Sequence, residues 1–181
     1  YTGYMVDVHE QFKGKKITVM GLGVLGRAVG DAAYLAECGA EVPVTDMKSE
    51  PQLHNSLEKL KKYPNIRFAL GGHSTDDFIR ADMIIKAAGV PLNSPYIDAA
   101  VEAGVHIYMS TALAAREAQK AGAIVVGVTG TRGKSTTTHM IYHVLHHMGK
   151  RAHLGGNVRG ISTLALLPHI QNGDILVLEL D

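Results

Sequence analysis

The sequence predicts an α/β protein built on parallel β-sheets, and three observations support this prediction. Short apolar runs alternate with helix-like segments along the chain, which favours parallel strands joined by helices. Two of the apolar runs, ending near Gly21 and Val128, are followed directly by glycine-rich turns. Each turn leads into a helix-like run, and a strand, glycine turn and helix in this order bring backbone N–H groups to a phosphate. We therefore expect two nucleotide-binding units.

Composition narrows the class of protein further. The chain has 181 residues, of which 46% are hydrophobic and 19% charged, enough for one full α/β domain and part of another. A formal charge of +1 without a long basic run gives no reason to expect nucleic acid or an anionic membrane as partner. No apolar segment approaches the roughly 18–20 residues that span a bilayer. The single cysteine, Cys38, is expected as a small core side chain in a monomeric, cytoplasmic protein.

The first elements follow the pattern of a Rossmann-like domain. Residues 16–21 are expected as a strand, followed by Gly21, Gly23 and Gly26 in G-x-G-x-x-G spacing and by a helix to about Cys38. A second strand, residues 41–46, ends on Asp46, 20 residues after Gly26. In a dinucleotide-binding unit, a carboxylate at this distance accepts hydrogen bonds from a ribose. Taken alone, this pattern favours NAD.

The rest of the first half continues the alternation. Leucines at helical spacing predict a helix within residues 51–64, and Ser94 and Pro95 are expected to open another that Gly104 ends. Further strands are expected at residues 66–70, 82–89 and 105–110, with a helix at 111–122. Five strands thus precede residue 122, so we place a domain boundary there, giving residues 1–121 and 122–181.

The second half begins with a strand at residues 123–128 and the glycine turn before Lys134. A lysine at this place carries a positive charge to the outer phosphates of a nucleotide, and the hydroxyl of Ser135 is suited to Mg²⁺. A short strand with a glycine turn is expected at residues 151–160 and a short helix at 161–170. The strand at 174–181 ends with Glu179 and Asp181. Glu179 is the better candidate for a second Mg²⁺ ligand, at the end of a strand beside the phosphate loop.

The phosphate loop departs from the general G-x-x-x-x-G-K-[ST] pattern, because Val128 stands where its first glycine would be. What stands here is T-G-T-x-G-K-S-T-T. With GLGVLG upstream and GGN and LELD downstream, it resembles the Mur ligases, ATP-dependent enzymes that build the peptide of bacterial cell-wall precursors. The segment AAGVPLNSPYIDAAVEAG most resembles the branch that adds D-glutamate. Arg159 interrupts the family's usual G-N-x-G.

The resemblance implies roles for particular residues. The first domain would bind the UDP group of the substrate rather than NAD, and Asn157 would contact its muramyl portion. The implied UDP-substrate residues are Gly23, Val24, Leu25, Asp46, Ala87, Ala88, Gly89 and Asn157. The implied ATP-phosphate residues are Gly130, Thr131, Arg132, Gly133, Lys134, Ser135 and Thr136. Catalysis would rest on Lys134, Ser135 and Glu179, with Ser135 and Glu179 also holding Mg²⁺.

The implied reaction begins with transfer of a phosphoryl group from ATP to the alanyl carboxylate of UDP-N-acetylmuramoyl-L-alanine. The amine of D-glutamate then attacks the acyl phosphate. Other parts of the family's machinery follow the LELD strand, so we expect this chain to hold an incomplete central ATP-binding domain, inactive alone and marginally stable in its second half. A ligase that adds L-alanine and a nucleotide-sensing NAD-binding module remain alternatives.

Three histidines, His139, His143 and His147, repeat at spacing i, i+4 and could place their imidazoles on one helical face. No carboxylate or cysteine joins them, and apolar residues occupy neighbouring positions. We therefore expect a surface or packing role rather than a metal site. Lys48, just after Asp46, is expected to be a solvated charge on a loop. The alternative is that it approaches the uracil or a phosphate.

Overall fold

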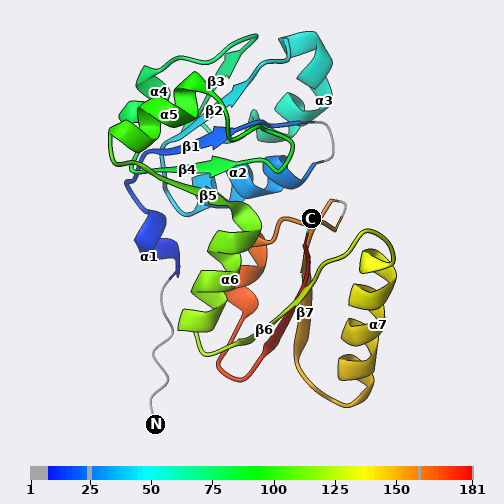
Figure 1. Cartoon of the computed structure of the whole chain (residues 1–181). Helices are drawn as coiled ribbons and strands as arrows, with labels where there is room; N and C mark the ends of the chain where they lie inside the picture. Colours follow the sequence, from blue (N-terminus) through cyan, green and yellow to red (C-terminus); the bar gives the residue numbers. More distant parts are fainter. Residues whose placement is uncertain (1–7, 24–25, 159, 181) are drawn as a thin grey trace.

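The computed structural model describes residues 8–23, 26–158 and 160–180. It contains two sheets, shown in Figure 1: a five-stranded sheet of order β3-β2-β1-β4-β5 and a three-stranded sheet of order β6-β8-β7. Neighbouring strands within both sheets are parallel, which confirms the predicted fold class. Within the described ranges, no helix is long and apolar enough to cross a membrane.

The described elements alternate as the sequence predicts. The strands of the first sheet are β1 (Ile17–Met20), β2 (Val42–Asp46), β3 (Ile66–Leu70), β4 (Met83–Lys86) and β5 (His106–Met109). The accompanying helices are α1 (Val8–Phe12), α2 (Arg27–Glu37), α3 (Glu50–Leu60), α4 (Asp76–Ile79), α5 (Pro95–Glu102) and α6 (Ser110–Lys120). The second sheet has β6 (Ile124–Val128), β7 (Ala152–Gly156) and β8 (Ile175–Glu179), with α7 (Lys134–His147) and η1 (Leu164–His169).

The first sheet is covered on both faces because successive side chains of a strand point to opposite sides. Ile17 and Val19 of β1 belong to the hydrophobic cluster that includes residues of α2 and α3. Met20 of the same strand joins Phe78 and Ile97 in a second cluster beneath α4 and α5. Strand order reverses across β1, so the helices after β1 and β2 and those after β3 and β4 lie on opposite faces, as right-handed crossovers require.

The second sheet packs against the first half of the chain through α6 and η1. Figure 1 shows α6 and the orange η1 on one side of this sheet and α7 on the other. Leu164 and Leu167 of η1 belong to the same buried cluster as Leu35 of α2, Leu113 of α6 and Leu176 of β8. The two sheets therefore share one continuous core.

Two features of the second half refine the sequence expectations. The expected short helix at residues 161–170 is a 3-10 helix, with Pro168 inside it; proline supplies no N–H and so cannot extend an α-helix there. Helix α7 buries little: Thr138 is its buried residue, while Met140, Val144 and the capping residue Met148 are exposed. Burial in the second half is therefore limited on the α7 face, whereas η1 packs into the core on the other face.

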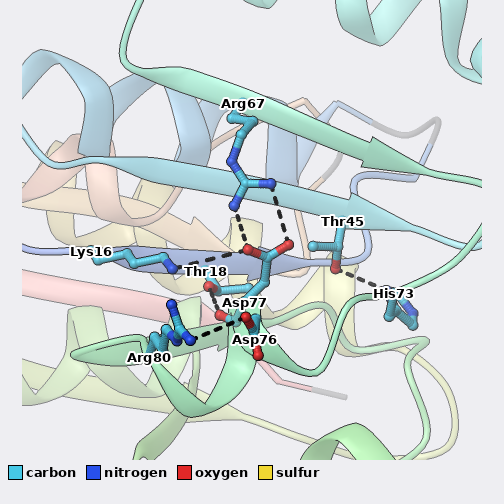
Figure 2. Close-up of polar contacts among 8 residues, drawn as sticks. All are labelled: Lys16, Thr18, Thr45, Arg67, His73, Asp76, Asp77 and Arg80. Atoms are coloured by element: carbon cyan, nitrogen blue, oxygen red, sulfur yellow. Dashed lines mark hydrogen bonds and ion pairs between the residues drawn. The ribbon is translucent and has the colours of Figure 1, made fainter.

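A polar cluster anchors α4 to the sheet, as Figure 2 shows. The carboxylate of Asp77, which is buried, accepts hydrogen bonds from Arg67 of β3 and lies 4.0 Å from the ammonium of Lys16. The hydroxyl of Thr18 in β1 donates to the Asp77 carbonyl oxygen. The pKa of Arg67 is raised chiefly by its hydrogen bond to Asp77. The cluster is structural, since each charge in it is paired.

Candidate functional site

The larger cavity, of about 600 Å³, lies at the carboxyl ends of the strands in the first sheet. Strand order reverses at β1, and the crevice outside such a reversal is where open parallel sheets bind ligands. Its lining includes Gly23, Asp46, Ala87, Ala88 and Gly89 of the predicted UDP-substrate residues. The predicted residues Val24 and Leu25 lie outside the described residues, as does Arg159.

The glycine turn on one wall of this cavity has a specific shape. Gly21 has φ of 88°, and a Cβ there would lie 2.6 Å from Cγ2 of Val90, so only glycine allows β1 to approach the loop after β4. The Gly23 N–H donates to Oδ2 of Asp46 at 3.0 Å, and the Ser56 hydroxyl donates to the Gly23 carbonyl at 3.0 Å. The turn is therefore held from both sides before any ligand binds.

Asp46 is buried, and both of its carboxylate oxygens already accept backbone hydrogen bonds. Oδ1 accepts the Lys48 N–H at 2.9 Å, and Oδ2 accepts that of Gly23. Each oxygen retains a second lone pair for a ligand. The hydrogen bonds between Asp46 and a nucleoside remain a prediction. Its bonds with the backbone N–H groups of Gly23 and Lys48 were not predicted, because sequence spacing does not reveal such contacts.

His73 and Tyr96 also line the larger cavity, although sequence reasoning gave His73 no role. The His73 Nδ1 lies 2.9 Å from the Thr45 hydroxyl (Figure 2), and its ring meets Tyr96 edge-on at 5.0 Å. Burial lowers the pKa of His73, while the charge of Asp46 opposes that shift. The ring is thus a fixed part of the cavity wall.

The phosphate loop brings together two of the predicted catalytic residues. The Ser135 hydroxyl donates to Oε1 of Glu179 at 3.0 Å. The pairing follows from the sheet, because β6 and β8 are parallel neighbours and Val128, just before the loop, lies opposite Glu179. Lys134 donates to the Gly130 carbonyl at 2.9 Å instead. The remaining predicted phosphate residues, Thr131, Arg132, Gly133 and Thr136, are exposed on the loop and the first turn of α7.

A second cavity, of about 380 Å³, lies between the two sheets. Its polar lining consists of Arg27, Asp31, Lys86, Ser110, Thr111, Asn157 and Glu179. Asn157, predicted to contact the substrate, lies here beside Glu179, and its N–H donates to the Glu179 carbonyl at 2.8 Å. Arg27, Ala28, Ala87 and Ala88 line both cavities, which are therefore contiguous.

Several polar residues of the second cavity were not predicted. Burial raises the pKa of Asp31, partly offset by hydrogen bonds from Ser162 and Ser110; the Ser162 hydroxyl donates to it at 2.6 Å. Burial lowers the pKa of Lys86, whose ammonium donates to the carbonyls of Ala87 and Val90. The sequence signal that could have indicated Asp31 is its position as a single acidic residue within the apolar face of a helix.

The histidine row forms no metal site. The Nδ1 atoms of His139 and His147 lie 2.7 and 3.1 Å from the carbonyls of Ser135 and His143, one turn earlier. Across the described part of the chain, no group of three or more His, Cys, Asp or Glu side chains could hold a metal ion. Cys38 is buried in the core, and Lys48 lines the larger cavity.

Two parallel sheets, each with a glycine turn at the carboxyl end of a strand, define the class of this protein as α/β. Two family models match it: "Mur ligase MurD-like, N-terminal domain" over residues 15–109 and "Mur ligase middle domain" over residues 128–181. The chain belongs to the Mur ligase family.

Similar proteins agree with this assignment. The "UDP-N-acetylmuramoylalanine--D-glutamate ligase" of Roseiflexus sp. (strain RS-1) is 42% identical over 94% of this chain and 35% of its own length. The protein of that name from Treponema pallidum (strain Nichols) is 38% identical over 97% of this chain and 32% of its own length. The chain thus spans about a third of these relatives.

Solved structures of the family have the same fold. The alanine ligase MurC from Thermotoga maritima is similar with a TM-score of 0.51 and 26% identity, over 91% of this chain and 36% of that one. A UDP-N-acetylmuramate:L-alanyl-gamma-D-glutamyl-meso-diaminopimelate ligase from Neisseria meningitides gives a TM-score of 0.54, covering 92% of this chain and 52% of that one. At 22% identity, the latter supports the fold alone.

Proposed function

We propose that this chain carries the substrate-nucleotide and ATP-phosphate sites of a ligase that adds D-glutamate to UDP-N-acetylmuramoyl-L-alanine in peptidoglycan precursor synthesis. The relatives named for that reaction, at 42% and 38% identity, support this choice over an L-alanine-adding ligase. The observation that carries the proposal is the Ser135 to Glu179 hydrogen bond of 3.0 Å beside a cavity continuous with the nucleotide cavity.

The two cavities suit the two ends of such a substrate. We place UDP in the larger cavity, against the turn at Gly23 and the segment from Ala87 to Gly89. The sugar and its alanyl group would extend into the cavity between the sheets, where Asn157 and Glu179 lie. This direction brings the alanyl carboxylate toward the phosphate loop, where it must receive the phosphoryl group.

Ser135 and Glu179 fit the needs of Mg²⁺, because a hydroxyl and a carboxylate are the oxygen ligands that this cation prefers. When bound there, Mg²⁺ would neutralise charge on the nucleotide phosphates. Lys134 would exchange the Gly130 carbonyl, which it holds at 2.9 Å, for phosphate oxygens. The loop N–H groups would add fixed dipoles where negative charge develops.

The proposed chemistry has two steps. A carboxylate oxygen of the alanyl group attacks the γ-phosphorus of ATP, forming an acyl phosphate and releasing ADP. The neutral amine of D-glutamate then attacks the acyl carbon, inorganic phosphate leaves, and the amine loses a proton. The residues of this chain contribute by orienting the carboxylate and by stabilising charge on the transferred oxygens.

Calorimetric titration of this chain with UDP and with NAD tests the proposal. We expect UDP to bind and NAD to give no response, because the relatives similar over almost the whole of this chain are named for a UDP substrate. Binding of NAD without binding of UDP would replace the ligase by the nucleotide-sensing module. We also expect no D-glutamate-dependent phosphate release by the 181-residue chain, which spans about a third of the length of its relatives.

A further inference from the structure

Arg27 is placed where the two cavities meet. It is the first residue of α2, directly after the glycine turn, and it lines both cavities. The other residues common to both linings, Ala28, Ala87 and Ala88, are apolar and uncharged. A charged side chain at this junction can contact a ligand in one cavity and a protein group in the other.

The guanidinium of Arg27 bridges the two halves of the chain. Its Nη1 donates to the side-chain oxygen of Asn157 at 2.6 Å and lies 3.5 Å from the Gly156 carbonyl. Among the described residues, none accepts a hydrogen bond from its Nη2 or Nε. Arginine presents five N–H donors in a planar fork, so one edge can hold the protein while the other binds an anion.

This contact determines which way the Asn157 amide faces. A guanidinium only donates, so the amide atom next to it is the oxygen. The amide NH₂ then lies on the side away from Arg27, in a residue that lines the cavity with Glu179. The orientation of the Asn157 amide is therefore set by a residue of the other half of the chain.

Two neighbouring lysine side chains are hydrogen-bonded to backbone carbonyls. The ammonium of Lys86 donates to the carbonyls of Ala87 and Val90, which hold the loop on the far wall. Lys134 is bound to Gly130 at the phosphate loop. Lys48 also lines the nucleotide cavity, but it follows β2, whereas Arg27 begins α2 directly after the glycine turn. A diphosphate at that turn would therefore meet the Arg27 fork.

We propose that Arg27 is a positioning residue that couples the two cavities, binding a diphosphate oxygen of the nucleotide through its outer N–H groups while its Nη1 orients the Asn157 amide. This inference rests on the proposed function, because it requires a nucleoside diphosphate in the larger cavity. The bound diphosphate restricts the motion of the guanidinium, and the guanidinium in turn holds the Asn157 amide through its Nη1 hydrogen bond.

Titrations with UDP and with uridine test the first half of the proposal, because uridine lacks the diphosphate. We expect R27M to weaken UDP binding roughly 10- to 100-fold, the range of a charge-assisted hydrogen bond, and to leave uridine binding unchanged. R27K, which keeps the charge but not the fork, should lose less. R80M is the matched control, because Arg80 is exposed, pairs with Asp76 and lines neither cavity. Thermal unfolding checks that each variant is folded.

The Asn157 side chain provides the second readout. In ¹⁵N-correlated NMR spectra, the Asn157 NH₂ signals, assigned by their loss in N157D, should shift when UDP is added to the wild type. Uridine should not shift them, and UDP should not shift them in R27M at saturating concentration. A residue that served only to stabilise the fold would leave the preference for UDP over uridine unchanged.

The outcomes separate the two proposals. If the wild type binds UDP and R27M binds it equally well, or if UDP still shifts Asn157 in R27M, the coupling role is overturned and the proposed function stands. If the wild type does not bind UDP, the proposed function fails and this inference fails with it. If R27M loses affinity for UDP but not for uridine, and UDP does not shift the Asn157 NH₂ signals in that variant, the proposed function and the coupling role are both supported.

Discussion

Replacing Gly30 with alanine should destabilise the protein even though alanine is the better helix former. Gly30 lies within α2, where exchange for alanine ordinarily gains about 0.5–1 kcal/mol. Here a Cβ would lie 2.7 Å from the Cβ of Ser162, which belongs to the segment before η1. That is about 0.7 Å short of ordinary van der Waals contact, so α2 and this segment would have to separate.

The expected magnitude follows from these two opposing effects. Overpacking of a close contact costs about 1–3 kcal/mol, which exceeds the gain in helix propensity. Separation would also weaken the 2.6 Å hydrogen bond from Ser162 to Asp31, one residue further along α2. We therefore expect G30A to lose about 1–2 kcal/mol. For a chain of this size that corresponds to a decrease in Tm of about 2–8 °C.

Urea unfolding followed by circular dichroism measures the change, and the double variant provides the control. S162G should itself be destabilised, since it removes the hydroxyl bound to Asp31. In that background, however, G30A should gain stability, because the opposing Cβ has gone, and the two changes should therefore be strongly non-additive. If G30A alone is more stable than the wild type, the contact between α2 and residue 162 is not tight and the reasoning is wrong.

Three further changes have clear expectations. Burial raises the pKa of Asp31, so its contribution to stability is fully present below the unfolded pKa of about 4 and is lost as pH rises through the folded pKa. D31N should therefore gain stability relative to wild type as pH rises above about 4 in urea titrations, and a difference independent of pH would contradict this. G156A should lower the free energy of unfolding by at least about 2 kcal/mol, because a Cβ there would overlap the Glu179 backbone. In the control G149A the added Cβ meets open space, so only about 1 kcal/mol should be lost, because of the positive φ. Equal losses in the two variants would refute the overlap. Removing the buried carboxylate in D77A should cost about 1.5–3 kcal/mol, because it removes a charged hydrogen bond to Arg67, whose half-exposed side chain can then be solvated. Chemical denaturation showing less than about 1 kcal/mol would contradict that.

The alternation of strands and helices was predictable because each apolar run is short and bounded by glycine, proline or a helix cap. Ser94 and Pro95, for example, open α5 as expected. The pairing of Ser135 with Glu179 was also within reach, since parallel strands bring their carboxyl ends to one edge. What sequence could not give was the docking of the two halves. Arg27 meets Asn157, 130 residues further along, only because η1 packs on α2.

Local pattern also misjudged how some residues act. Asp46 was interpreted through its distance from the glycine turn, which predicts a ligand contact but not the two backbone N–H groups that it holds. Asp31 gave a weak signal, because one acidic residue in an apolar helix face is compatible with a solvated edge. Its burial depends on Ser162, which lies in a different half of the chain. Contacts of this kind depend on tertiary packing and have no local signature.

The GGN segment links the residues predicted at the phosphate and substrate sites through hydrogen bonds. Gly156 allows β7 to approach the end of β8 so closely that the Asn157 N–H donates to the Glu179 carbonyl at 2.8 Å. Glu179 thus contacts both segments, with its side chain bound to Ser135 and its backbone carbonyl bound to Asn157. The Asn157 side chain is held in turn by Arg27, which lines the nucleotide cavity. The beginning of α7 and the beginning of α2, which each follow a glycine turn, are thus linked by three hydrogen bonds. These run from Ser135 through Glu179 and Asn157 to Arg27.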